Sequence, residues 1–301
     1  MKLIKPKVES VYCTELDGIL NVIQAAAKIC YASQKFSDKP IEICRFIDQL
    51  INLGHYSPLG HGIFWVNTIM VSTRINDPVN WFLKSIIDDR EQSRHFWVSN
   101  ESPRIIGISA RTIAQNFDQQ GREFANFTNF YNVIKDKFYD YFLNIKRIPF
   151  ELRPFSFEIW SNSKALKQLN RHNEEMALCE QSTRYCNFHT DRFGNEVQYL
   201  QPYWWEDEKT SQAKKDFYIS ACQRNENDYL QATSKDKNGN AVFSTDEAST
   251  LLSSDVLSKG IYTASVREWK HIIEVRVKGT TGKPHGDIKE AITLLMNKYE
   301  W

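Results

Sequence analysis

The sequence lacks an excess of charge of either sign. Its 301 residues include 38 lysines and arginines and 37 aspartates and glutamates. This balance gives no electrostatic basis for broad binding to nucleic acid or to a membrane surface. No apolar stretch is long enough to span a bilayer, and the first residues lack the apolar core of a signal peptide. We therefore expect a soluble, cytoplasmic protein that binds neither nucleic acid nor membrane.

Several sequence motifs that bind metals or nucleotides are also missing. The six cysteines form no Cys-x-x-Cys pair, which predicts reduced thiols in an intracellular protein. The seven histidines show no His-x-x-x-His pattern, and we find no carboxylate–histidine spacing, so we predict no metal site. Glycine-rich phosphate loops of the Rossmann and P-loop types are absent as well. Any bound nucleotide must therefore be held by side chains and helix ends.

The pattern of apolar residues predicts a mixture of helices and strands. Leu20, Ile23 and Ala27 recur at helical spacing, and Pro40 suits the first turn of a second helix. Runs of β-branched and aromatic residues predict strands. We predict helices over 17–33, 40–53, 77–88, 121–145, about 206–234 and 245–252, and strands over 63–71 and 154–160. This mixture predicts an α+β fold in which helices flank a central, mostly antiparallel sheet.

An aromatic stripe runs through the predicted helix over 121–145. Its members recur at spacings of three and four residues: Phe124, Phe127, Tyr131, Ile134, Phe138 and Tyr141. Such a stripe is typical of a helix face that packs into a core. We therefore interpret it as a packing face and not as a cofactor site.

A helix that Asn162 or Ser163 caps is predicted to lead into a group of polar side chains. Gln168 lies three residues before Arg171 and four before His172. Residues at these spacings share one face of a helix. We therefore expect these three side chains to point in the same direction.

A second group of donors follows after a short irregular segment. Ser182 and Thr183 offer hydroxyl groups and backbone amides, and Arg184 offers a planar guanidinium. Together they supply the fixed fork of donors that a phosphate group requires. The sequence therefore predicts an anion-binding loop at this position.

The order of these motifs resembles the signature of the flavin-dependent thymidylate synthases. That signature reads Arg-His-Arg, a short spacer and then Glu-x-Ser-x-Arg-Tyr, and the chain has Arg171-His172 followed by Glu180 to Tyr185. Further segments resemble the same family in the same order: residues 26–31, 54–62, 155–159, 185–188, 192–196 and 267–285. The similar segments cover roughly residues 1–70, 150–205 and 245–301.

The resemblance implies a fold, an assembly and a reaction. It implies a single domain of this family's type over residues 1–301, with an insertion at about 74–148 that compact members lack, and a homotetramer with active sites between subunits. The reaction implied is the reductive methylation of deoxyuridine monophosphate to thymidylate. Methylenetetrahydrofolate and NADPH are the implied co-substrates, and FAD is the implied cofactor. The partner is thus a pyrimidine deoxynucleotide monophosphate.

The resemblance also assigns roles to individual residues. Arg276 and Ser182 are the implied catalytic residues, and Arg276 would come from a different chain than the signature. The implied substrate contacts are Gln168, Glu180, Ser182, Thr183, Arg184 and Arg276. The implied flavin contacts are His61, Arg171, His172, His271 and His285. Because the family's chemistry needs no cysteine, Cys179 and Cys186 are not expected to be nucleophiles.

The sequence departs from the family pattern at several positions. Asn173 replaces the second arginine of the triplet, and Gly60 replaces a glutamate before His61. Ser249 stands where the family has an arginine that contacts the pyrimidine. Three hypotheses follow: thymidylate synthesis with an altered site, flavin-dependent one-carbon transfer such as hydroxymethylation to another pyrimidine nucleotide, or a catalytically silent nucleotide-binding paralogue.

Overall fold

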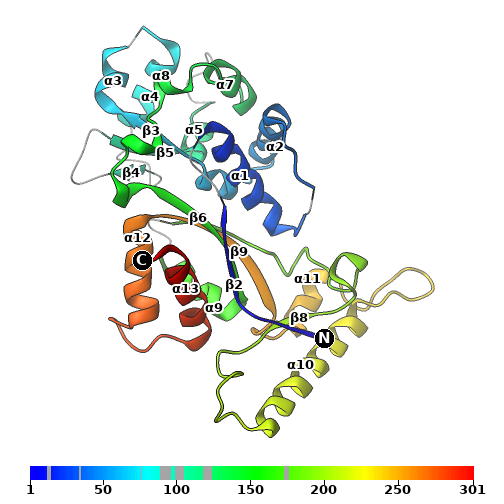
Figure 1. The fold of residues 1–301 in the computed structure, drawn as a ribbon. Coiled ribbons are helices and arrows are strands. Elements are labelled where there is room, and N and C mark those ends of the chain that lie inside the picture. Colours follow the sequence, from blue (N-terminus) through cyan, green and yellow to red (C-terminus); the bar gives the residue numbers. More distant parts are fainter. Residues whose placement is uncertain are drawn as a thin grey trace.

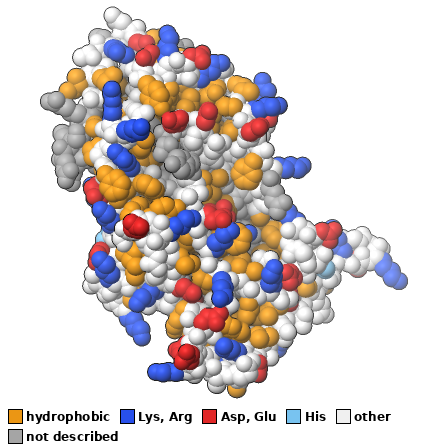
Figure 2. All heavy atoms as spheres, in the orientation of Figure 1, with side chains coloured by type: hydrophobic (Ala, Val, Ile, Leu, Met, Phe, Trp, Pro, Cys, Tyr) orange, Lys and Arg blue, Asp and Glu red, His pale blue; other side chains and the backbone are white. Residues whose placement is uncertain are grey.

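The structure is a computed structural model, and its elements form two lobes (Figure 1). It describes residues 1–11, 15–33, 35–74, 76–88, 96–98, 105–117, 124–172 and 176–301. Helices α1 to α8 and a small sheet make one lobe, and the C-terminal helices gather around the central sheet in the other. Positive and negative side chains are interspersed over the face shown in Figure 2, in keeping with the balanced charge of the sequence.

The central sheet has four strands in the order β2-β6-β9-β7, and every pairing in it is antiparallel. The strands are β2 (Lys7–Val11), β6 (Pro154–Asn162), β9 (Leu257–Ser265) and β7 (Met176–Glu180). One face packs on α1 (Leu16–Cys30), and the other packs on α9 (Ser163–Leu169), α12 (Val266–Ile273) and α13 (Gly286–Tyr299). The predicted α+β fold with an antiparallel sheet flanked by helices is confirmed.

Alternation along the strands produces these two buried faces. Phe157 and Ile159 of β6 point into the core that holds Trp269 of α12. Ile261 of β9 points the other way and packs with Ala26 of α1. Because side chains alternate along a strand, one strand can serve both layers. The central strands are consequently buried on both faces.

The strand predicted over 63–71 differs from its prediction in two ways. It is β3 (Ile63–Asn67), and it belongs to a separate antiparallel sheet with β5 (Ile105–Ser109) and β4 (Phe96–Val98). It also ends early, because the Asn67 side chain accepts hydrogen bonds from the backbone N–H groups of Ile69 and Met70 at 3.0 and 3.4 Å. This cap starts the helix α3 (Thr68–Thr73).

The helices of the first lobe pack with the small sheet around one core. They include α2 (Pro40–Asn52), α4 (Pro78–Asp88), α5 (Ala110–Gln115), α7 (Phe127–Ile134) and α8 (Phe138–Tyr141). The predictions for α1, α2 and α4 are confirmed within three residues at each end. The helix predicted over 121–145 is instead two short helices, and residues 121–123 lie outside the described chain. The aromatic stripe is confirmed as a packing face, since all six of its side chains belong to this core or pack against it.

The remaining elements form a third core beside the central sheet. They are β1 (Lys2–Ile4), which pairs in parallel with β8 (Gln198–Leu200), α10 (Gln212–Thr233) and α11 (Thr245–Ala248). The predicted helix over 245–252 is thus a single α-helical turn, followed by a 3₁₀ turn at Ser249–Leu251. Among the described residues, no helix is both long and apolar enough to cross a membrane.

Candidate nucleotide-binding site

A strand divides the signature into two halves. The segment between His172 and Ser182, expected to be irregular, contains β7 at residues 176–180. A strand rises about 3.3 Å per residue, so the Cα atoms at its two ends lie about 13 Å apart. His172 precedes one end and Ser182 follows the other. One chain therefore presents the two halves as separate groups of side chains.

The loop after β7 is anchored to α1 by its backbone. The Ser182 N–H donates to the Cys30 carbonyl at 3.0 Å, and the Arg184 N–H donates to the Ser182 hydroxyl oxygen at 3.3 Å. The second bond uses the oxygen as an acceptor, which leaves the Ser182 hydroxyl hydrogen available as a donor. Thr183 lies between them and is half-buried. The expected concentration of donors in this loop is present.

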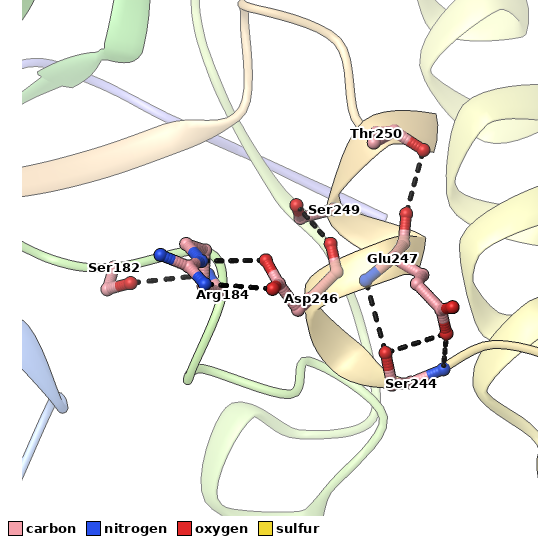
Figure 3. Close-up of polar contacts among 7 residues, drawn as sticks. All are labelled: Ser182, Arg184, Ser244, Asp246, Glu247, Ser249 and Thr250. Carbon is pink, nitrogen blue, oxygen red and sulfur yellow. Dashed lines mark hydrogen bonds and ion pairs between the residues drawn. The ribbon is translucent and has the colours of Figure 1, made fainter.

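Arg184 is exposed and holds the carboxylate of Asp246 (Figure 3). Its Nε donates to Oδ1 at 2.7 Å and its Nη2 donates to Oδ2 at 2.9 Å. This two-pronged geometry is the one that guanidinium groups also use for phosphate. The hydrogen bonds and charge of Arg184 lower the pKa of Asp246. In this structure, Asp246 thus occupies the donors that the sequence assigned to a ligand.

Ser249 lies one turn beyond Asp246, the residue that Arg184 holds (Figure 3). The Ser249 hydroxyl donates to the Asp246 carbonyl at 2.6 Å. A capping box, in which Ser244 and Glu247 bond to each other's backbone N–H groups, starts this short helix. The position that carries an arginine in the family is therefore occupied here by a serine bonded within its own turn.

Glu180 closes β7 and bonds across the sheet. Its Oε1 accepts a hydrogen bond from the Tyr262 hydroxyl at 2.7 Å. Burial, followed by the charge of Glu180, raises the pKa of Tyr262 well above its usual value. Tyr262 therefore stays a hydrogen-bond donor to Glu180 at neutral pH, and this bond fixes the carboxylate at the start of the loop.

Gln168 and Arg276, two predicted substrate contacts, lie together. Arg276 Nη2 donates to the Gln168 carbonyl at 2.8 Å, and Nη1 donates to its Oε1 at 3.4 Å. Burial and the nearby Arg171 lower the pKa of Arg276. The resemblance implies that Arg276 and the signature come from different chains; within its own chain, Arg276 contacts Gln168, which precedes the signature. It lies on a π-helical turn, Glu274–Lys278, a feature frequent at functional sites.

Helix α9 ends before the residues that were expected to share its face. Asn162 caps its start through the Ala165 N–H at 2.8 Å, as predicted, but the helix stops at Leu169. Arg171 and His172 lie in the 3₁₀ turn that follows. The predicted helix therefore carries Gln168 but not Arg171 or His172, and the common direction of the three side chains stays a prediction.

His172 lies beside two residues of α12. Its Nδ1 is 3.0 Å from Glu268 Oε1, and its ring centroid is 5.6 Å from that of His271. Glu268 and His271 are three residues apart, so the statement that the sequence has no carboxylate–histidine spacing is wrong. Glu268 and His271 were not recognised as a pair from the sequence. His285, another predicted flavin contact, instead caps α13 through the Asp287 N–H at 3.4 Å.

His61 has no exposed surface and lies against the central sheet. Its Nδ1 is 2.8 Å from the Thr263 hydroxyl oxygen. Burial lowers the pKa of His61 to about 3, and a hydrogen bond with the Leu178 backbone offsets this shift only in part. The imidazole is therefore neutral at pH 7. The predicted contact with a flavin would require this side chain to be uncovered.

The buried His61 predicts a loss of stability in acid. Its pKa is lower in the folded protein than in the unfolded chain, so its contribution is complete above about pH 6.5 and declines as the pH falls toward 3. Between pH 7 and pH 5 we expect a loss of about 2 kcal/mol from this residue. Urea unfolding of wild type and His61→Gln at both pH values measures it. An equal pH dependence in the two proteins would contradict the assignment.

A cavity of about 530 Å³ lies between α1, the central sheet and the loop over 192–198. Lys28, Arg192 and Lys259 contribute cations, and Phe36 and Phe193 contribute flat apolar surfaces. Gln181 also lines it, so the cavity adjoins the loop that holds Ser182. None of these three cations was predicted from the sequence. Lys28 and Arg192 lie in segments 26–31 and 192–196, which resemble the family, so the resemblance could have identified these two.

The described cysteines are free thiols. A hydrogen bond with Cys30 and burial raise the pKa of Cys179, and burial raises the pKa of Cys186. A thiolate nucleophile is disfavoured at both positions, in line with the prediction.

The structure is thus an α+β protein with an arginine-bearing loop of hydrogen-bond donors at the end of a sheet strand. Residues 97–298 match the family described as "Thymidylate synthase complementing protein". The chain therefore belongs to this family, the flavin-dependent thymidylate synthases, and is a methylase enzyme. No curated protein matches the sequence at a significant level.

Several solved structures are similar to this chain. The UMP/dUMP methylase PolB from Streptomyces cacaoi bound with 5-Br UMP is 12% identical, with a TM-score of 0.42 over 99% of this chain and 91% of that one. The complex of PolB from Streptomyces cacaoi with 5-Br dUMP is 13% identical, with a TM-score of 0.40 over 99% of this chain and 92% of that one. Thymidylate synthase X from Helicobacter pylori with FAD and dUMP is 16% identical, with a TM-score of 0.34 over 48% of this chain and 66% of that one. These values are too low to transfer a function.

Proposed function

We propose that the protein methylates deoxyuridine monophosphate to thymidylate, with methylenetetrahydrofolate as the carbon donor, NADPH as the reductant and FAD as the cofactor. Membership of the family supports the class of reaction. The observation that carries the proposal is the exposed fork of Arg184 in an anchored loop of donors. A nucleotide phosphate has the negative charge, and it can present two of its oxygens to the two parallel donors of this fork.

The loop would bind the nucleotide by exchanging one anion for another. Arg184 would release the Asp246 carboxylate and take two phosphate oxygens in its place. The Ser182 hydroxyl would donate to a third oxygen, because its own oxygen already accepts from the Arg184 N–H. Thr183 would add a hydroxyl at the rim, and Glu180 would lie at the junction between nucleotide and flavin. Phosphate binding therefore requires no rearrangement of the loop backbone.

The two cations Arg171 and Arg276 suit a flavin. Bound FAD would supply the hydride. The Nε of Arg276 is buried without a hydrogen-bond partner among the described residues, and Arg171 lies close enough to lower its pKa. A buried donor beside a second cation fits an anionic or carbonyl oxygen of a ligand. In this proposal, Arg171 and His172 hold the flavin, and Arg276 orients the pyrimidine beside it.

The complete site would be shared between chains of a homotetramer. No hydrogen bond joins the group around Arg276 to the loop around Arg184 among the described residues. Each group alone provides only part of what a nucleotide and a flavin need. A second copy of the chain that places its Arg276 group against the Arg184 loop would complete both.

One observation favours a second candidate, one-carbon transfer to another pyrimidine nucleotide. Ser249 replaces the arginine that contacts the pyrimidine in the family, and it lies on the turn next to Asp246 and Arg184. The phosphate half of the site is thus retained while the half that faces the base is changed. Assays of purified protein with FAD, NADPH, methylenetetrahydrofolate and either dUMP, UMP or dCMP distinguish the candidates. Absence of turnover with all three nucleotides would contradict both.

The ion pair at Arg184 predicts that Asp246 restrains nucleotide binding. Asp246→Asn keeps the shape of the side chain but removes its charge, so the nucleotide phosphate no longer competes with an anion. Because the pair is exposed and screened by solvent, we expect dUMP to bind only about twofold to fivefold more tightly. Calorimetric titration at low salt measures this change. Asp228→Asn, on the exposed face of α10, is the matched control, and an equal gain in both variants would contradict the prediction.

A further inference from the structure

Three potential metal ligands meet between α12 and the turn that follows α9. His172 lies in the 3₁₀ turn after α9, and Glu268 and His271 lie one turn apart on α12. One ligand atom from each residue lies within 4.8 Å of the other two. Glutamate and histidine at this i, i+3 spacing project from the same face of a helix, an arrangement that also occurs at metal sites in helical bundles.

We propose that His172, Glu268 and His271 form a binding site for a divalent transition-metal ion such as Zn²⁺. Zinc takes imidazole nitrogen and carboxylate oxygen at about 2.0–2.2 Å, and two His ligands with one Glu are a known set that leaves a fourth position open. Two tetrahedral ligands at such bond lengths lie about 3.4 Å apart. The 3.0 Å between His172 Nδ1 and Glu268 Oε1 is close to this spacing.

The burial of His172 is a second, independent observation. Its side chain is only 8% exposed, so the ring is held in place beside Glu268. An ion bound by Nδ1 at this position would be largely shielded from water, which strengthens its attraction to the Glu268 carboxylate. His271 is exposed and gives an ion access from solvent. The neighbouring Lys270 does not oppose an ion here, because its ammonium group pairs with Glu151 at 2.9 Å.

The site goes beyond the proposed reaction and replaces the prediction of no metal site. Its ligands include two of the predicted flavin contacts, His172 and His271, so a bound ion would use imidazoles that the resemblance assigned to the cofactor. The ion would also join the turn after α9 to α12. It would therefore link the segment that bears Arg171 to the helix that leads into Arg276.

Metal titration of flavin-free protein tests the site directly. We expect about one Zn²⁺ per chain with a Kd below about 10 μM, and we expect Co²⁺ to give the intense visible absorption of four-coordinate cobalt. His271→Ala and Glu268→Gln should each weaken binding by about tenfold or more. His271 is exposed, so its replacement should leave the fold intact, which circular dichroism verifies. His55→Ala, at another exposed histidine, should bind metal like wild type.

Two results would overturn the proposal. One is the absence of Zn²⁺ binding below about 100 μM by folded wild type. The other is binding that His271→Ala and Glu268→Gln reduce no more than His55→Ala does. Neither result depends on flavin or nucleotide, so a failure of the proposed reaction and a failure of the metal site can be distinguished.

Discussion

Replacing Arg184 with alanine should weaken dUMP binding by about tenfold to a hundredfold, because hydrogen bonds to charged groups contribute about 1.5–3 kcal/mol. The lysine variant should also lose about tenfold or more. Lysine keeps the charge, but a single ammonium cannot reproduce the two parallel donors that now hold both oxygens of Asp246. Calorimetric titration of the flavin-loaded protein with dUMP measures both losses.

The control for Arg184 is an arginine of similar exposure in a region without a proposed role. Arg224 lies on the exposed face of α10, and Arg224→Ala should bind dUMP like wild type. If Arg184→Lys bound dUMP as tightly as wild type, the fork would not be the phosphate site. The two donors of Arg184 would then serve only to hold Asp246.

The second large effect concerns a site shared between chains. Arg184→Ala and Arg276→Ala should each reduce turnover by at least about a hundredfold, since each removes a guanidinium from the proposed site. When the two variants are assembled together, some sites receive an intact Arg184 from one chain and an intact Arg276 from the other. Random assembly should restore about a quarter of the sites. The experiment measures the turnover of the co-expressed variants and compares it with the turnover of each variant alone.

A result without recovery would contradict the shared site. The control is the double variant, which carries both substitutions in every chain and can form no intact site. Light scattering should show a tetramer for all of these proteins, so that a loss of assembly is not mistaken for a loss of chemistry. A monomer at micromolar concentration, with full activity, would exclude the arrangement.

Local signals in the sequence were sufficient for much of the fold. Helix α2 begins at Pro40 as predicted, because proline fits the first turn and the apolar residues after it recur at helical spacing. Asn162 was identified as a cap because its short side chain can accept from the first turn of α9. The aromatic stripe was identified as core from its period alone. These features depend on residues that are close together in the sequence.

The errors arise where distant segments decide the structure. Residues 176–180 lack the β-branched side chains that favour strands, and they form β7 because β9 offers an open edge for pairing. The same strand splits the signature, which no local pattern indicates. Asp246 is separated from Arg184 by 62 residues, so its occupation of the fork follows only from the folded chain. Asn67 illustrates a local error, since its capping role was not considered when the strand over 63–71 was predicted.

In the candidate site too, features that depend on adjacent residues were predicted, and features that depend on distant segments were not. The sequence correctly gathered Ser182, Thr183 and Arg184 into one loop of donors, because they are adjacent. The contact between Gln168 and Arg276 spans 108 residues, and the resemblance named both residues only as substrate contacts. The histidines were the least predictable, since their roles depend on burial: His61 is inside the core, His172 is nearly so, and His271 is exposed.

The most direct test of the central claim follows the transferred carbon. Purified protein is incubated with FAD, NADPH, dUMP and methylenetetrahydrofolate whose methylene carbon is labelled with carbon-13, and the nucleotide is analysed by mass spectrometry and NMR. We predict a labelled methyl group at C5 of the pyrimidine and no product without NADPH. Unlabelled dUMP recovered unchanged, from protein that is folded and binds both FAD and dUMP, would contradict the proposal that this protein is a thymidylate-forming methylase.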